Sequence, residues 1–191
     1  MTENETQEYQ VNIPEESFAL LEFGQENQAG SAVVNVALRD FEPKIIFGWH
    51  LSLIVELDDV DEDNMPTDAE RDVIDEFGKR LDIAIIGNDS EKPNAVFLAQ
   101  VLFNGTLELI WRVFEPERVN EFLQSLHKES GDQKPREFDF QMEYDPEWKI
   151  CQWHLKEHPE AEASLLALLQ ARRSRKTRLS VNTSISSDRS A

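Results

Sequence analysis

The order of hydrophobic patterns between residues 48 and 144 constrains the fold of this chain more than any other feature. Three segments have apolar side chains at every second position, namely residues 48–57, 106–114 and 138–144, and a fourth strand at 95–103 is joined to the second of these by Asn104-Gly105. This alternation is typical of strands that bury one face. After Thr67 and after Pro116, apolar residues instead recur every three to four positions, as in helices that bury one side. The sequence predicts the order strand, helix, strand, strand, helix, strand.

Turn and cap residues mark the ends of these elements. Thr67 followed by Glu70 is the capping-box pattern of a helix N-terminus, and Gly87 follows the last apolar position of that helix. Asn104-Gly105 is a strong signal for a two-residue hairpin turn. Pro116 suits the first position of the second helix. The predicted elements therefore have defined boundaries.

An α+β fold follows from this order. Two helices at these places among four strands predict a ferredoxin-like βαββαβ sandwich, with both helices on one face of the sheet. Strand patterns at 18–23 and 32–38 add an N-terminal β-hairpin. The predicted organisation is a disordered N-terminus (residues 1–15), an α+β domain (16–158) that contains the unit at 48–144, a C-terminal helix (159–171) and a basic disordered tail (172–191).

Charge restricts the partners of this protein. The chain holds 38 acidic and 19 basic residues, a net charge of −19. Residues 172–191 carry a surplus of +5, so residues 1–171 carry −24. A body this acidic repels phosphate backbones, which excludes direct nucleic-acid binding by the body and favours a basic protein partner. The tail could bind nucleic acid, act as an address, fold back on the acidic body, or be a disordered extension without a role, and the sequence slightly favours the last.

The chain has the features of a soluble cytoplasmic protein. Its one cysteine, Cys151, excludes an internal disulfide framework. The N-terminus has neither the basic start nor the apolar stretch of a signal peptide. No apolar run approaches the length of about 20 residues that a membrane span needs. We therefore expect no membrane association, and the oligomeric state stays open.

Three stretches together resemble a known family. They are Asn64-Met65-Pro66 before an acidic helix, the hairpin before the helix that starts at Pro116, and the turn Asp145-Pro146-Glu147-Trp148. Over residues 15–156 the chain resembles bacterial domain-of-unknown-function family 695, and more distantly the type B regulators of ribonuclease E activity. The family usually has Gly where this chain has Asn64, and Asn tolerates the same left-handed backbone.

The family has no established activity, and the more distant resemblance to the ribonuclease regulators implies a protein that acts by binding another protein. We expect a non-enzymatic adaptor or inhibitor, of the ribonuclease-regulator or immunity type, that uses its carboxylates to attract a basic surface. The expected steering residues are Asp58, Asp59, Asp61, Glu62, Asp63, Asp72, Asp75 and Glu76. Trp148 and Trp153 either cover the edge of the sheet or form an aromatic contact patch.

Two metal sites are alternatives to this hypothesis. Positions 1, 3, 5, 9 and 12 of a calcium loop coincide with Asp59, Asp61, Asp63, Thr67 and Glu70. The same residues are equally explained as a solvated turn followed by a helix cap. Cys151, His154 and His158 have a spacing that suits zinc, but they offer three ligands where a structural site needs four. Without these sites, no cofactor is expected.

The sequence holds no motif for catalysis. It has neither the G-x-S-x-G pattern of a serine nucleophile nor a glycine-rich phosphate loop. His50 and Arg112 lie on the outward sides of their strands, so we expect both at the surface. A metal-dependent hydrolase remains the enzymatic alternative, and it would require carboxylates that converge in a cleft.

Overall fold

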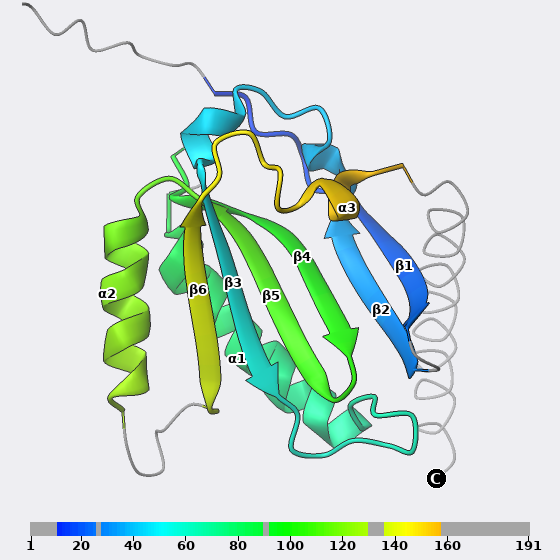
Figure 1. The fold of residues 1–191 in the computed structure, drawn as a ribbon. Helices are drawn as coiled ribbons and strands as arrows, with labels where there is room; N and C mark the ends of the chain where they lie inside the picture. Colours follow the sequence, from blue (N-terminus) through cyan, green and yellow to red (C-terminus); the bar gives the residue numbers. More distant parts are fainter. Residues whose placement is uncertain (1–10, 26–27, 90–91, 130–135, 158–191) are drawn as a thin grey trace, which may run out of the picture.

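The computed structural model describes residues 11–25, 28–89, 92–129 and 136–157. These residues form an α+β fold with a six-stranded antiparallel open sheet and three α-helices (Figure 1). Most of the predicted disordered N-terminus, the predicted helix at 159–171 and the predicted basic tail at 172–191 lie outside the described residues.

The strands and helices follow the predicted order. The strands are β1 (Phe18–Gln25), β2 (Gln28–Asn35), β3 (Trp49–Glu56), β4 (Ala95–Phe103), β5 (Thr106–Val113) and β6 (Phe138–Tyr144). The helices are α1 (Asp68–Ile86), α2 (Pro116–His127) and α3 (Gln152–Leu155), with 3-10 turns η1 (Val36–Leu38) and η2 (Lys44–Phe47).

Local sequence explains where these elements begin and end. The Thr67 hydroxyl accepts a hydrogen bond from the backbone N–H of Glu70 at 3.3 Å and so caps α1. Gly87 ends α1 with φ of +94°. Asn104 and Gly105 have φ of +50° and +74°, the left-handed pair that a tight turn between β4 and β5 requires.

The sheet has the order β1-β2-β4-β5-β3-β6. All neighbouring strands are antiparallel, and among the described residues β1 pairs with β2 alone, which confirms the N-terminal hairpin. Helix α1 connects β3 to β4, and α2 connects β5 to β6. Figure 1 shows α1 crossing behind the sheet. The hairpin therefore extends the sheet on the β4 side.

One core lies between the sheet and both helices. It contains the alternating inward residues of β3 and β5, such as Leu51, Leu53 and Trp111, packed against Leu81 of α1 and Leu123 of α2. All five side chains are fully buried. This arrangement confirms the inward faces that alternation predicts for β3 and β5.

A second core covers part of the opposite face. Here the chain segments 38–47 and 148–151, rather than long helices, supply the buried residues Phe41, Phe47, Trp148 and Cys151. Figure 1 shows the segment after β6, together with α3, in front of one end of the sheet. The outward sides of the strands are therefore not uniformly exposed to solvent.

This cover corrects two predictions. Arg112 is 0% exposed and His50 only 8% exposed, although both point away from the helices. One guanidinium nitrogen of Arg112, Nη1, donates to Oδ2 of Asp145 at 3.1 Å, Nη2 donates to the Asp145 carbonyl oxygen, and Nε donates to the Phe47 carbonyl oxygen at 3.3 Å. Alternation identifies the side of a strand, but it does not show whether another segment covers that side.

One predicted boundary also differs. The strand predicted at 32–38 ends at Asn35, and η1 follows. The Asn35 side chain accepts a hydrogen bond from the Ser17 N–H and donates one to the Phe97 carbonyl oxygen. The turn at Asp145-Pro146-Glu147-Trp148 is formed, with Asp145 accepting hydrogen bonds from the N–H groups of Lys149 and Ile150, and α3 begins at Gln152.

Candidate partner-binding surface

The loop between β3 and α1 is held in place by its own carboxylates. Asp61 Oδ1 accepts hydrogen bonds from the backbone N–H groups of Asp63 and Met65, at 2.9 and 3.0 Å. Asp59 Oδ2 accepts one from the Thr67 hydroxyl at 2.6 Å. Asn64 has φ of +57°, the left-handed backbone expected from the resemblance. The loop is therefore a fixed structure rather than a loose acidic segment.

The Glu70 carboxylate accepts more hydrogen bonds than the carboxylates of Asp59 and Asp61 in this loop. Its two oxygens accept hydrogen bonds from Nη1 and Nη2 of Arg136, both at 2.5 Å, and Oε1 also accepts one from the backbone N–H of Asp58 at 3.0 Å. The Glu70 side chain does not return to Thr67, whose N–H donates to the Asp59 carbonyl oxygen. Only the threonine half of the predicted capping box forms.

The calcium hypothesis is not supported. Within the described parts of the chain, which include the whole loop, no three His, Cys, Asp or Glu side chains are placed to hold a metal ion. Asp59 and Asp61 are directed at the loop's own donors, and Glu70 is paired with Arg136. The hydrogen bonds agree instead with a turn and a helix cap.

The zinc hypothesis receives no support either. Cys151 is buried, its sulfur donates to the Trp148 carbonyl oxygen at 3.4 Å, and burial raises the pKa of its thiol to about 11. His154 is partly buried and burial lowers its pKa, while His158 lies outside the described residues. A thiol that stays protonated at neutral pH is a poor metal ligand.

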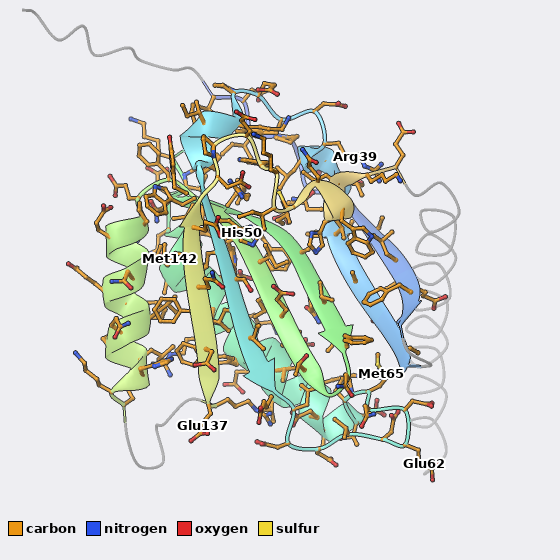
Figure 2. The ribbon with its side chains drawn as sticks, viewed as in Figure 1. Arg39, His50, Glu62, Met65, Glu137 and Met142 are labelled. Carbon is orange, nitrogen blue, oxygen red and sulfur yellow. The ribbon has the colours of Figure 1, made fainter. Side chains whose placement is uncertain are left out.

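The expected steering residues are brought together on one part of the surface. Asp58, Asp59, Asp61, Glu62, Asp63, Asp72, Asp75 and Glu76 are all exposed. Residues 58–76 hold ten acidic side chains and one basic one, a net charge of −9. Figure 2 shows Glu62 extending away from the loop into solvent. We call the loop and the first half of α1, residues 58–76, the acidic surface.

The two tryptophans of the predicted contact patch have different environments. Trp148 is 1% exposed, stacks on Phe41 with ring centres 5.5 Å apart, and donates its indole N–H to the carbonyl oxygens of Lys44 and Phe47. Its assignment as a contact residue is therefore corrected, because the side chain offers no surface. Trp153 is 46% exposed and meets Phe23 edge to face.

Trp153 does not adjoin the acidic surface. It belongs to α3, which lies at the opposite end of the sheet from the loop before α1 (Figure 1). Trp153 with Phe23 covers the region where β1 and β2 form the edge hairpin. A single partner would have to span the sheet to contact both regions, so Trp153 and the acidic surface are two separate regions of the surface.

A cleft that no sequence pattern predicts adjoins the acidic surface. It has a volume of about 340 Å³ and opens between α1 and strands β1, β4 and β5. Phe18, Phe97 and Trp111 form an aromatic wall, with Phe97 and Trp111 meeting edge to face at 5.7 Å. Glu16, Asp75, Lys79, Asp82 and Gln100 add the polar and charged groups.

Asp82 is the charged group of this lining that bonds to the aromatic wall. Its Oδ1 accepts a hydrogen bond from the indole N–H of the fully buried Trp111 at 2.9 Å. Burial raises the pKa of its carboxyl, and the nearby charge of Glu16 adds to this effect, whereas the bond from Trp111 opposes it. In the sequence, Asp82 directly follows Leu81 of the apolar stripe. This charged residue beside the buried face of α1 is the one sequence signal that could have pointed to the cleft.

The role of Arg136 was not predicted either, because no pattern in the residues around it identifies an arginine before a strand as the partner of Glu70.

None of the helices in the described ranges is long and apolar enough to cross a membrane. Comparisons of the chain with protein-family models, with curated proteins and with solved structures found no match.

Proposed function

We propose that this protein is a non-enzymatic binding protein that uses the acidic surface to dock on a basic protein partner, as an adaptor or inhibitor. The observation that carries the proposal is the net charge of −9 on residues 58–76, with nine exposed carboxylates that include those of the first half of α1. Charges of one sign on one surface speed the encounter with an oppositely charged partner.

The fixed shape of the loop supports this proposal. When a loop becomes ordered only on binding, the entropy that it loses weakens the affinity. A loop that is already ordered does not have this cost. The hydrogen bonds of Asp59 and Asp61, and the ion pair between Glu70 and Arg136, hold the loop before a partner arrives. The remaining carboxylates, such as Glu62 and Asp63, stay available to a partner.

We further propose that β3, α1, β4, β5, α2 and β6 form a ferredoxin-like unit. The order β4-β5-β3-β6 within the sheet, and the two helices packed on one face, support this topology. Kinship with family 695 and with regulators of ribonuclease E activity remains a proposal that rests on the sequence resemblance. A ribonuclease or a basic toxin would be a special case of the proposed partner.

The test compares two charge variants with equal net charge. In the first, Asp72→Asn, Asp75→Asn and Glu76→Gln neutralise three carboxylates of the acidic surface. In the control, Glu117→Gln, Glu121→Gln and Asp139→Asn neutralise three exposed carboxylates on α2 and β6. Each protein is used to capture partners at low salt, and the association rate of the captured protein is measured as a function of salt.

We expect the first variant to associate about tenfold more slowly than the control, with a weaker dependence on salt, because charges at an interface act chiefly on the association rate. Equal rates for the two variants, or an association rate of the wild-type protein that does not change with salt, would contradict the proposal.

A further inference from the structure

The cleft beside α1 contains an unusual residue for a helix interior. Gly78 lies in the middle of α1, where glycine is less favourable than alanine by about 1 kcal/mol. Packing does not require it, because a Cβ atom added at Gly78 would meet no heavy atom within 4 Å. The absent side chain leaves space at the mouth of the cleft.

The lining of the cleft has a definite chemical character. Its floor is apolar and aromatic, formed by side chains such as Phe97, Trp111 and Leu109. Its charged groups are three carboxylates, on Glu16, Asp75 and Asp82, and one ammonium group, on Lys79. Its volume of about 340 Å³ is at the lower end of the range of about 300–1,000 Å³ for small-molecule sites.

Asp82 is positioned to receive a cation. Oδ1 is fixed by the Trp111 indole N–H, and no hydrogen bond to Oδ2 occurs within the described ranges of the chain. A carboxylate held against an aromatic wall pairs well with a charged donor on an apolar stem, because the stem replaces water on the wall while the charge meets the carboxylate.

We propose that this cleft binds a small organic cation, namely a primary amine carried on an apolar or aromatic stem. The ammonium group bonds to Oδ2 of Asp82, and the stem lies along the partly exposed rings of Phe18 and Phe97 beside Gly78. The site is separate from the proposed docking of a protein on the acidic surface, so either proposal can fail without the other.

Three probes with nearly the same stem test the charge requirement: 2-phenylethylamine, 2-phenylethanol and 3-phenylpropionate. They are titrated into the full-length chain, and binding is followed by the NMR signal of the Trp111 indole N–H, which bonds directly to Asp82. We expect a saturable shift with the amine, binding at least tenfold weaker with the alcohol, and none with the carboxylate.

Two variants test the position of the site. Asp82→Asn keeps an oxygen for the Trp111 indole but removes the charge, and we expect about tenfold or greater loss of affinity for the amine, as for other charge-assisted hydrogen bonds. Gly78→Leu adds a side chain at the mouth of the cleft, at a position where a Cβ atom meets no heavy atom within 4 Å, and we expect it to abolish binding.

Asp72→Asn is the matched control, since it removes an exposed charge of α1 outside the lining of the cleft and should leave binding within about twofold. The proposal is overturned if the amine and the alcohol bind equally, if the Trp111 signal does not respond to the amine, or if Asp82→Asn and Asp72→Asn have the same effect.

Discussion

The two faces of the sheet are covered in different ways. On one face, α1 and α2 provide regular apolar stripes, and the core between them and the sheet consists of aliphatic and aromatic side chains. On the other face, short irregular segments cover one end of the sheet, and the core there includes the ion pair of Arg112 with Asp145. Irregular segments leave backbone groups without helix partners, and buried polar side chains satisfy them.

Arg112 and Asp145 illustrate this difference. Arg112 donates to the carbonyl oxygen of Phe47, in the first covering segment, and to that of Asp145, just before the second. Asp145 in turn accepts from the N–H groups of Lys149 and Ile150 in the second segment. The ring of Trp148 lies 5.0 Å from the guanidinium carbon. One buried pair thus connects β5 to both segments. On the other face α1 and α2 are held to the sheet mainly by hydrophobic packing, with one hydrogen bond from the Trp111 indole to Asp82 of α1.

The largest expected effect comes from breaking this pair. Arg112→Met should lower the free energy of unfolding by about 3–5 kcal/mol, because Asp145 is left buried without its cation. Chemical denaturation measures the loss. Adding Asp145→Asn should recover part of it, and a double-mutant cycle without coupling between the two sites would contradict the role of the pair.

A core truncation probes the helix-covered face. Leu81→Ala should lower the free energy of unfolding by about 2–5 kcal/mol, since it removes a fully buried side chain of α1. Val73→Ala, at an exposed position of the same helix, is the control and should change stability by less than about 0.5 kcal/mol. Thermal unfolding measures the stability of both variants. Similar losses of stability for Leu81→Ala and Val73→Ala would show that α1 does not bury its apolar stripe against the sheet.

The second face should lose stability in mild acid. Burial and the charge of Arg112 lower the pKa of His50 to about 4, below the 6.5 of the unfolded chain. As the pH falls from 6.5 toward 4, the unfolded state binds the proton first, so stability is lost across this window, by at most about 3 kcal/mol. Burial lowers the pKa of His154 as well, in the same direction.

His50→Gln checks this prediction, because it removes the titrating group. Denaturation curves between pH 7 and 4 should show a shallower decline for the variant than for the wild-type protein, on the order of the stability assigned to His50. Asp145 contributes below this range, since its folded-state pKa lies under the ordinary 3.8. An equal decline in both proteins would place the acid sensitivity elsewhere.

The smallest effect has the opposite sign. Gly78→Ala should raise the free energy of unfolding by about 0.5–1 kcal/mol, because alanine is a better helix residue and its Cβ meets no atom within 4 Å. Thermal unfolding measures the gain. A destabilised variant would mean that the space beside Gly78 is filled in solution.

The regular elements could be predicted because their signals are local. Thr67, Gly87, the turn at Asn104-Gly105 and Pro116 each act through their immediate backbone, and the structure places each at the predicted boundary. The site was predicted less fully. The exposure of the acidic surface followed from its charge, whereas the cleft depends on residues from α1, β1, β4 and β5 that only folding brings together.

The sequence by itself determined the order of strands and helices, the inward faces of β3 and β5, and the place of the acidic surface, because periodicity, caps and charge act over a few residues. Tertiary structure alone decided that Arg112, His50 and Trp148 are buried, that Glu70 pairs with Arg136, and that Asp82 faces an aromatic cleft. Each of these depends on contacts between segments distant in the chain, and no local pattern encodes which segment will cover a given face.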